Sequence, residues 1–443
     1  MRFAVSFVLA SIASLAAACS SSSGDSATGT DGGTHPQQDG GNEASPGDDA
    51  SADANPMDGG TGIRDGAVGD AGAGALGALM PQVVQLNANS VIANPKVMPI
   101  LYENDPNRAD VEAFVPNYAQ STAWGVHTAE YGVGALTVAT VRHIPGSAPA
   151  TITDAAVTAM LQQNLGGTSP AWGAPDPSTV YAFFFPKGTI VNDGSGGKSC
   201  TDYDGYHSSV AIGNVTVPYA ISVQCPGFDG MGITDLQQLT IVASHEIVEA
   251  VTDPIDTNPG YAQADNPHAV WGVITGGETG DMCAFIDGFA WKPSDMNYSV
   301  QRMWSNAAAK AGHDPCVGGA SSSYYQTVPT LPDSVTINGP VQTKGLKVAR
   351  GSSGTLTLTV YADTPSAGPF VVTIDDYSSV YANGNKLLSF TVPSGQVNAG
   401  DQIQVTVNAL GRDSQLGQAA AFVVNTKPVG GGATTYFYGL IGE

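Results

Sequence analysis

Residues 244–254 read Ser244-His245-Glu246-Ile247-Val248-Glu249-Ala250-Val251-Thr252-Asp253-Pro254. Apolar side chains flank the charged ones, which favours a helix that packs one face against a core. Thr234 or Asp235 can cap the free amides at the start of this helix. Pro254 forces it to end two or three residues earlier. The sequence therefore predicts one long internal helix over this region.

Three polar side chains of this helix have the spacing of a zinc site. Residues four apart lie on the same face, so His245 and Glu249 can bind one ion while Glu246 lies beside it. In the H-E-x-x-H pattern of zinc hydrolases, two histidines bind zinc and the glutamate is the general base. Here Glu249 replaces the second histidine. We expect His245 and Glu249 to be metal ligands and Glu246 to be catalytic.

Further ligands are expected from two other segments. Gly276-Gly277-Glu278-Thr279-Gly280-Asp281-Met282-Cys283 is a glycine-rich turn about thirty residues downstream, and glycines allow the backbone to bend closely around a site. Glu278 is the preferred third ligand. Asp281 is the alternative, or it holds the His245 ring as a second layer. His207 is a further candidate ligand.

The charge balance indicates that a cation binds here. Glu246, Glu249 and Asp253 lie close together among apolar residues and would repel one another. Residues 79–320 contain 22 acidic and only eight basic side chains. An arginine or lysine for each carboxylate is therefore not expected, and zinc is the predicted cofactor.

The N-terminal residues predict export. Residues 1–18 have the basic start and apolar run of a secretory signal peptide. Leu15-Ala16-Ala17-Ala18-Cys19 resembles a lipobox, so we expect lipidation of Cys19; ordinary cleavage that leaves Cys19 unpaired is the alternative. The predicted location is the cell envelope, with a lipid anchor in the outer membrane or at the cell surface.

Residues 19–78 are predicted to be a disordered acidic tether, because they have almost no large apolar side chains. Residues 20–74 hold ten acidic residues and one basic residue, and so contribute much of the net charge of −23. This acidity argues against nucleic acid as a partner.

The four remaining cysteines are expected to form two disulfides, as is usual in exported proteins. Sequence order favours Cys200 with Cys225 and Cys283 with Cys316. A cysteine metal site is the weaker alternative because the chain has no Cys-x-x-Cys pair.

Two folded domains are predicted. Residues 79–318 mix helix and strand signals and are expected to form an α+β, zincin-like catalytic domain with a mixed sheet and a central motif helix. Residues 319–329 resemble a linker. Residues 330–443 show strand signals at short intervals, which predicts an all-β immunoglobulin-like sandwich. The predicted strands are 97–102, 136–142, 180–185 and 215–223 in the first domain and 355–362, 370–374, 387–392, 402–407 and 419–424 in the second, and the predicted helices include 109–118 and 151–165.

Several segments together resemble the EXORDIUM-like or phosphate-induced protein family over residues 90–317. They are Pro95-Lys96-Val97-Met98-Pro99-Ile100-Leu101-Tyr102, Glu130-Tyr131-Gly132-Val133, Cys200 through Tyr206-His207 to Gln224-Cys225-Pro226-Gly227, the His245-Glu246 helix and Glu278-Thr279-Gly280-Asp281-Met282-Cys283. The resemblance implies an extracellular protein associated with cell walls and growth in plants. It implies no substrate.

The main functional hypothesis is a lipid-anchored, exported zinc hydrolase that acts on peptides. The second is a noncatalytic envelope protein that binds polysaccharide or a protein partner and keeps a structural cation. A third is a degenerate zincin scaffold without metal. The sequence does not predict the oligomeric state.

Overall fold

The computed structural model describes residues 63–64 and 72–443, except residues 229–230, 285, 320–322, 338–340, 365–366, 379–383 and 415. The predicted signal peptide 1–18, Cys19 and most of the predicted tether 19–78 lie outside the described residues. The prediction of disorder is wrong at the C-terminal end of that tether. Helix α2 (Ala73–Gly77) is ordered, and its Leu76 is fully buried in a hydrophobic core. None of the described helices combines the length and the apolar character needed to cross a membrane.

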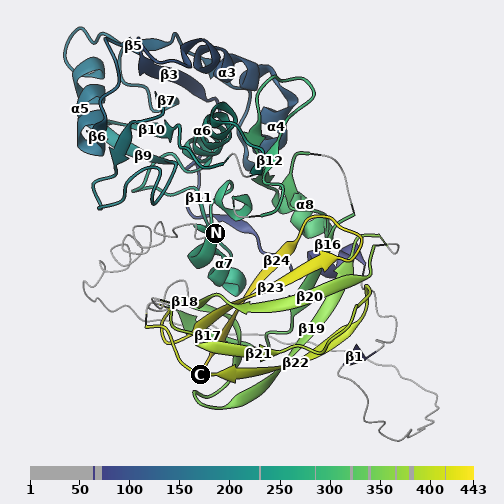
Figure 1. Ribbon diagram of the computed structural model, residues 1–443. Coiled ribbons are helices and arrows are strands. Elements are labelled where there is room, and N and C mark those ends of the chain that lie inside the picture. The colour runs from purple at the N-terminus through teal and green to yellow at the C-terminus, as the bar shows by residue number, and fades with distance from the viewer. Residues whose placement is uncertain are drawn as a thin grey trace, which may run out of the picture.

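A six-stranded mixed sheet organises the first domain (Figure 1). Its main order is β4-β3-β7-β10-β9, and β5 also pairs with β3. Strand β9 is the antiparallel edge strand, whereas the other pairings are parallel. The strands are β3 (Lys96–Tyr102), β4 (Thr137–Val138), β5 (Arg142–Ile144), β7 (Thr179–Phe185), β9 (Gly205–Ile212) and β10 (Val215–Val223). The predicted mixed sheet is confirmed, but the single strand expected at 136–142 is divided into β4 and β5.

Helices cover both faces of this sheet. On one face, α3 (Arg108–Gln120), α4 (Thr122–Thr128) and α6 (Asp235–Thr252) share a core with Val97 and Leu101 of β3. On the other face, α5 (Asp154–Leu165) packs on alternate strand residues such as Ile100 and Phe183. This alternation follows from the two-residue period of strands.

The predicted helix at 151–165 begins three residues too early. Residues 151–153 form a short strand, β6, and the helix begins at Asp154. Ala155 and Ala156 are exposed, whereas Val157 and Leu165 are buried with Leu161. The larger apolar side chains therefore decide which face of α5 is buried.

Helix α6 carries the motif and has the predicted ends. The Thr234 side chain accepts a hydrogen bond from the Gln237 amide, and the Gln237 side chain accepts one from the Thr234 amide. This capping box satisfies two amides that have no partner within the helix. The helix ends at Thr252, two residues before Pro254.

Short elements complete the first domain and bring distant segments together. The paired strands are β2 (Val83–Gln85) with β11 (Tyr261–Ala264), β6 (Thr151–Thr153) with β8 (Ile190–Asn192), β12 (Ala290–Trp291) with β13 (Val300–Gln301), and β14 (Met303–Trp304) with β15 (Cys316–Val317). The helices are α7 (Ala269–Thr275) and α8 (Asn306–Ala311), with 3-10 turns at Ala129–Tyr131, Asn266–His268 and Asp281–Cys283.

Both predicted disulfides are present. Cys200 is bonded to Cys225, and Cys283 is bonded to Cys316. The first joins the segment before β9 to the segment after β10. The second fixes the end of the glycine-rich turn to β15.

The second domain is a sandwich of two five-stranded sheets. One sheet has the order β1-β22-β19-β16 with β21 beside β22, and the other has the order β17-β18-β24-β23-β20. Their strands are β1 (Ile63–Arg64), β16 (Tyr325–Pro329), β17 (Asp333–Ile337), β18 (Val341–Lys347), β19 (Ser353–Ala362), β20 (Phe370–Asp376), β21 (Leu388–Thr391), β22 (Gln402–Ala409), β23 (Ala420–Pro428) and β24 (Thr435–Gly442). The all-β prediction is confirmed, with additional strands that were not predicted.

The prediction of a linker over 319–329 is wrong at its C-terminal end, because β16 (Tyr325–Pro329) belongs to the sandwich and is buried throughout.

The two domains also share one hydrophobic cluster. Trp271 of α7 lies 5.4 Å from Phe437 and 4.9 Å from Tyr438 of β24, measured between ring centroids. Figure 1 shows α7 between the α6 layer and the sandwich. The two domains are therefore joined by packed aromatic side chains at this contact.

Candidate metal centre

The edge strand β9 carries His207 toward α6. In β9, Tyr206 packs in the core on the far face of the sheet, so the next residue, His207, points to the opposite face. Gly205 lies on the same face as His207. A Cβ at Gly205 would lie 2.8 Å from Glu246 Oε1 and 2.5 Å from Val242 Cγ1. The missing side chain therefore lets β9 approach α6.

Helix α6 brings His245, Glu246 and Glu249 to the same place. His245 Nε2 lies 2.9 Å from Glu249 Oε2 and 4.0 Å from Glu246 Oε1. His207 Nδ1 lies 3.7 Å from both Glu246 Oε2 and Glu249 Oε2. The three predicted helix residues thus converge with His207, and the exposed fractions of the Glu249 and Glu246 side chains are only 4% and 7%.

The glycine-rich turn closes the cluster from the other side. The backbone amides of Gly280 and Asp281 each donate to Glu249 Oε1 at 3.0 Å. A Cβ at Gly280 would lie 2.8 Å from His245 Nδ1 and 2.9 Å from Glu249 Oε1. Gly276 has φ +114°, where a side chain is strained, and a Cβ there would overlap Asp281. Glycine is therefore needed at these positions for the turn to reach α6.

Gln301 orients the His245 ring, and the sequence analysis missed it. Its side-chain amide donates to Gly280 O at 2.7 Å, so its oxygen faces His245 Nδ1 at 3.0 Å. The His245 Nδ1 nitrogen must then carry the proton, which leaves Nε2 directed at the carboxylates. The backbone amide of Gln301 also donates to Ser244 Oγ. A glutamine some 55 residues from the motif gives no local sequence signal.

The ligand-type atoms form two groups that share Glu249. One group is His245, Glu249 and Asp281, and the other is His207, Glu249 and Glu278. In the first, His245 Nε2 lies 3.5 Å from Asp281 Oδ1 and 2.9 Å from Glu249 Oε2. Ligands at about 2.0–2.1 Å from a tetrahedral zinc ion lie roughly 3.3 Å apart, so this group has suitable spacing.

The preferred third ligand, Glu278, is not grouped with His245. Its Oε2 instead lies 3.4 Å from His207 Nε2. The alternative considered from the sequence, Asp281, takes the place beside His245. All six predicted residues lie in one cluster, but the structure divides them differently from the predicted set of His245, Glu249 and Glu278.

Burial and mutual repulsion shift the pKa values of the acids. Burial raises the pKa of Glu278 well above its usual range and that of Glu246 above its usual value. Burial and the nearby Glu249 carboxylate raise the pKa of Asp281 to about 6. Burial also acts to raise the pKa of Glu249, but His245 outweighs it and lowers that pKa. The cluster thus strongly favours added positive charge.

Burial acts in the opposite direction on the pKa values of the two histidines. Burial acts to lower the pKa of His207 and of His245, but the surrounding carboxylates outweigh it and raise both pKa values well above the ordinary value. Among the described residues, no lysine or arginine forms an ion pair with Glu246, Glu249, Glu278 or Asp281. Protons or a bound cation must therefore supply the compensating charge.

Two neighbouring acids, Asp253 and Asp204, lie outside the two ligand groups that share Glu249. Asp253 accepts a hydrogen bond from the Gly260 amide at 2.7 Å, which holds the turn after α6. Burial raises the pKa of Asp204 to about 6. Asp204 also lies near Cys200 and Cys225. Because these cysteines form a disulfide, that trio offers no thiolate ligands.

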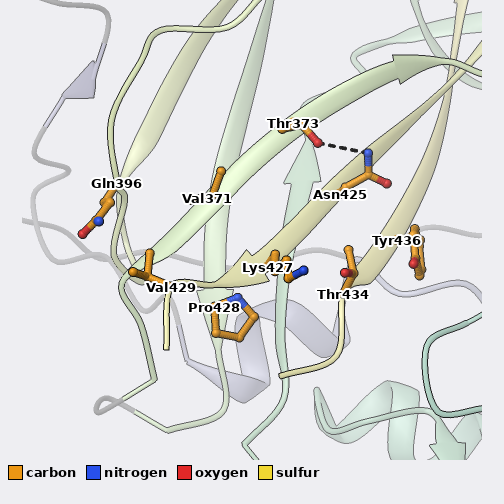
Figure 2. Close-up of a pocket in the computed structure, with 9 residues that line it drawn as sticks. All are labelled: Val371, Thr373, Gln396, Asn425, Lys427, Pro428, Val429, Thr434 and Tyr436. Atoms are coloured by element: carbon orange, nitrogen blue, oxygen red, sulfur yellow. Dashed lines mark hydrogen bonds between the residues drawn. The ribbon is translucent and has the colours of Figure 1, made fainter. Parts of the chain in front are cut away.

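A pocket of about 600 Å³ lies on the sandwich, away from this cluster (Figure 2). Amide, hydroxyl and apolar groups line it, and the Asn425 side chain donates to Thr373 Oγ1 at 3.2 Å. Its lining residues are Val371, Thr373, Gln396, Asn425, Lys427, Pro428, Val429, Thr434 and Tyr436. This lining contains neither a carboxylate nor an imidazole, the two side-chain types that gather in the cluster on α6.

Comparisons with known proteins assign no family. No family description matches the chain, and no curated protein matches it. Among solved structures, domains 4 and 5 of the S-layer protein SbsC match with 14% identity and a TM-score of 0.15, over 26% of this chain and 46% of that one. The SrpA adhesin of Streptococcus sanguinis matches with 10% identity and a TM-score of 0.17, over 27% of this chain and 57% of that one. Likenesses this low carry no inference about fold or function.

Proposed function

We propose that this chain is an exported zinc-dependent hydrolase of the peptidase class. The observation that carries the proposal is the convergence of two imidazoles and four carboxylates on α6, β9 and the glycine-rich turn. No lysine or arginine among the described residues neutralises these carboxylates by an ion pair. A divalent cation is the simplest compensating charge, and mixed imidazole and carboxylate ligands suit zinc.

His245, Glu249 and Asp281 are the proposed ligands of this ion. Gln301 fixes the tautomer of His245, and the amides of Gly280 and Asp281 fix the Glu249 carboxylate. Both ligands are thereby held in place before the ion binds, which reduces the cost of ordering them. The bound ion would polarise a substrate carbonyl and activate water.

Glu246 is the proposed general base. It is the second residue of the motif, and its carboxylate faces both His207 and His245 from a largely buried position. Burial raises its pKa, which makes the carboxylate a better proton acceptor near neutral pH. It would accept a proton from the attacking water and deliver it to the leaving amine. We also propose that the first domain is zincin-like.

A noncatalytic protein with a structural cation is the second candidate. The observation that favours it is the composition of the site, in which two carboxylates accompany one imidazole. Carboxylates donate more charge than imidazoles, so the ion would be a weaker Lewis acid. In this case the protein would bind polysaccharide or a protein partner in the cell envelope.

Zinc analysis and Glu246→Gln distinguish these candidates. Full-length protein purified without chelators should contain about one or more equivalents of zinc, because the ligands are preorganised. Less than about 0.2 equivalents would overturn the proposal. Glu246→Gln should lower cleavage of a mixed peptide library by roughly 10²–10⁴-fold with zinc content unchanged. The control Glu103→Gln alters an exposed carboxylate outside the cluster and should change neither quantity.

Envelope location and lipid anchoring are also proposed. The two disulfides support the envelope location, since disulfides persist in oxidising compartments outside the cytosol. The apolar signal-like segment and Cys19 add sequence support. Cys19→Ser should move the protein from the membrane fraction to the soluble envelope fraction. Unchanged membrane association would count against the anchor.

A further inference from the structure

We infer that the cluster binds two divalent cations, the second between His207 and Glu278, with Glu249 contributing to both positions. This inference rests on the proposed function, since it adds an ion to the same centre. The two groups of ligand-type atoms, which share only Glu249, are its starting point.

The Glu249 carboxylate lies between the two groups. Its Oε1 atom is engaged by the amides of Gly280 and Asp281. Its Oε2 atom faces His245 Nε2 at 2.9 Å and His207 Nδ1 at 3.7 Å. One ligand atom from each of His207, Glu249 and Glu278 also lies within 4.8 Å of the other two, so Glu249 can contribute to the second position as well. One carboxylate oxygen can contact two cations, as in two-metal hydrolases, where the ions lie about 3.5–4 Å apart.

Glu278 supplies an independent observation. Its Oε2 atom is buried and has no hydrogen-bond partner among the described residues. The nearest ionisable nitrogen is His207 Nε2 at 3.4 Å. His207 is thus an ion-pair partner but donates no hydrogen bond to this oxygen, and buried polar atoms nearly always have a hydrogen bond. A cation between Glu278 and His207 would provide that partner.

The composition of the cluster also suits two ions. Glu246, Glu249, Glu278 and Asp281 are four carboxylates gathered beside two imidazoles. Two divalent ions would balance the charge of four ionised carboxylates and leave the imidazole nitrogens free to act as ligands. The donors are oxygen and nitrogen atoms, which suit zinc or another first-row transition metal.

Zinc titration of the full-length metal-free protein tests this inference. We expect two equivalents at saturation by calorimetry and elemental analysis, and one equivalent for Glu278→Gln. The matched control is Glu112→Gln, because Glu112 also contacts a histidine, with His143 Nε2 at 2.8 Å, but lies outside the cluster. This control should retain two equivalents.

The outcomes separate this inference from the proposed function. No bound zinc overturns both. One equivalent of zinc in the wild-type protein overturns only the inference of a second ion, whatever the zinc content of Glu278→Gln. If Glu278→Gln fails to fold, manganese-loaded wild-type protein decides the question, because two manganese ions at this separation give an exchange-coupled paramagnetic resonance spectrum and one ion does not.

Discussion

Two carboxylate environments lie on opposite faces of the same sheet. On the α5 face, Asp154 Oδ1 accepts hydrogen bonds from the hydroxyls of Tyr206 at 2.8 Å and Tyr219 at 2.6 Å. On the α6 face, Glu278 Oε2 is buried without a hydrogen-bond partner. Tyr206 and His207 are consecutive in β9, so a single step along the strand separates one carboxylate with two phenol donors from a cluster of several carboxylates.

The difference shows which acids of this domain are structural. Two phenol donors satisfy Asp154 at the start of α5, and no cation is needed there. The acids around Glu249 have backbone amides and histidines but no lysine or arginine ion pair in the described part of the chain. Closely spaced carboxylates without a compensating lysine or arginine therefore identify the site.

The largest expected effect is the loss of zinc affinity when a carboxylate on the α6 face is removed, compared with removal of one on the α5 face. Asp281→Asn should weaken zinc binding by at least about 100-fold, because loss of a ligand costs more than the 10–100-fold typical of a ligand's supporting partner. Asp154→Asn should leave zinc affinity unchanged and lower only the melting temperature. Competition with a chromogenic chelator measures both affinities. Equal losses in the two variants would contradict the assignment of Asp281 as a ligand.

A smaller effect is expected when the support of a ligand is removed. Gln301→Leu should weaken zinc binding by about 10–100-fold, because His245 loses the acceptor that fixes its tautomer. Gln238→Leu is the matched control, since this buried glutamine bonds to the backbone of Cys225 and Val223 instead. Chelator competition should show normal affinity for Gln238→Leu. If Gln301→Leu binds zinc normally, Gln301 has no positioning role.

The close approach of β9 and α6 can be tested through glycine. Gly205→Ala should reduce the free energy of unfolding by roughly 1–3 kcal/mol, because its Cβ would meet Val242, Glu246 and the Ile221 carbonyl. Gly125→Ala, at a helical position with open space, should be neutral or stabilising by up to about 1 kcal/mol. Urea denaturation measures both. A neutral Gly205→Ala would mean that the strand can move away from the helix.

The smallest expected effect is a pH dependence of the metal-free protein. Asp281 has a pKa of about 6 in the folded chain and about 3.9 when unfolded. Between these values the folded state holds a proton that the unfolded state has lost, so this residue reduces stability as the pH rises from about 4 to 6. Zinc should bind more tightly over the same interval, because the ligand must be deprotonated.

Thermal melts of metal-free wild-type and Asp281→Asn protein at several pH values isolate the contribution of Asp281 to the pH dependence of stability. The wild-type melting temperature should fall by a few degrees relative to the variant as the pH rises through this window. A constant difference between the two would show that Asp281 keeps an ordinary pKa.

Local patterns sufficed for the parts of the fold that local chemistry decides. The Thr234 cap and Pro254 gave the limits of α6, and the order of the cysteines gave both disulfides. The motif spacing placed His245 and Glu249 on one face. These predictions succeeded because the interacting residues lie within a few turns or have few alternative partners.

Long-range packing decides what the sequence did not show. Asp281 lies beside His245 in place of Glu278 because the amides of Gly280 and Asp281 bond to Glu249. Gln301 reaches His245 only through the pairing of β12 with β13. Residues 325–329 were assigned to a linker because they follow a run of Gly and Ser, yet pairing with β19 makes them a strand.

The contact of Trp271 with Phe437 and Tyr438 limits how this protein can be divided in the laboratory. A fragment that stops at residue 318 would present the Trp271 face of α7 to water, just before the turn that carries Glu278 and Asp281. Such a fragment is expected to aggregate or to lose the arrangement of that turn. Expression of a chain from residue 63 onward, which keeps both domains and β1, is therefore the appropriate starting point for purification.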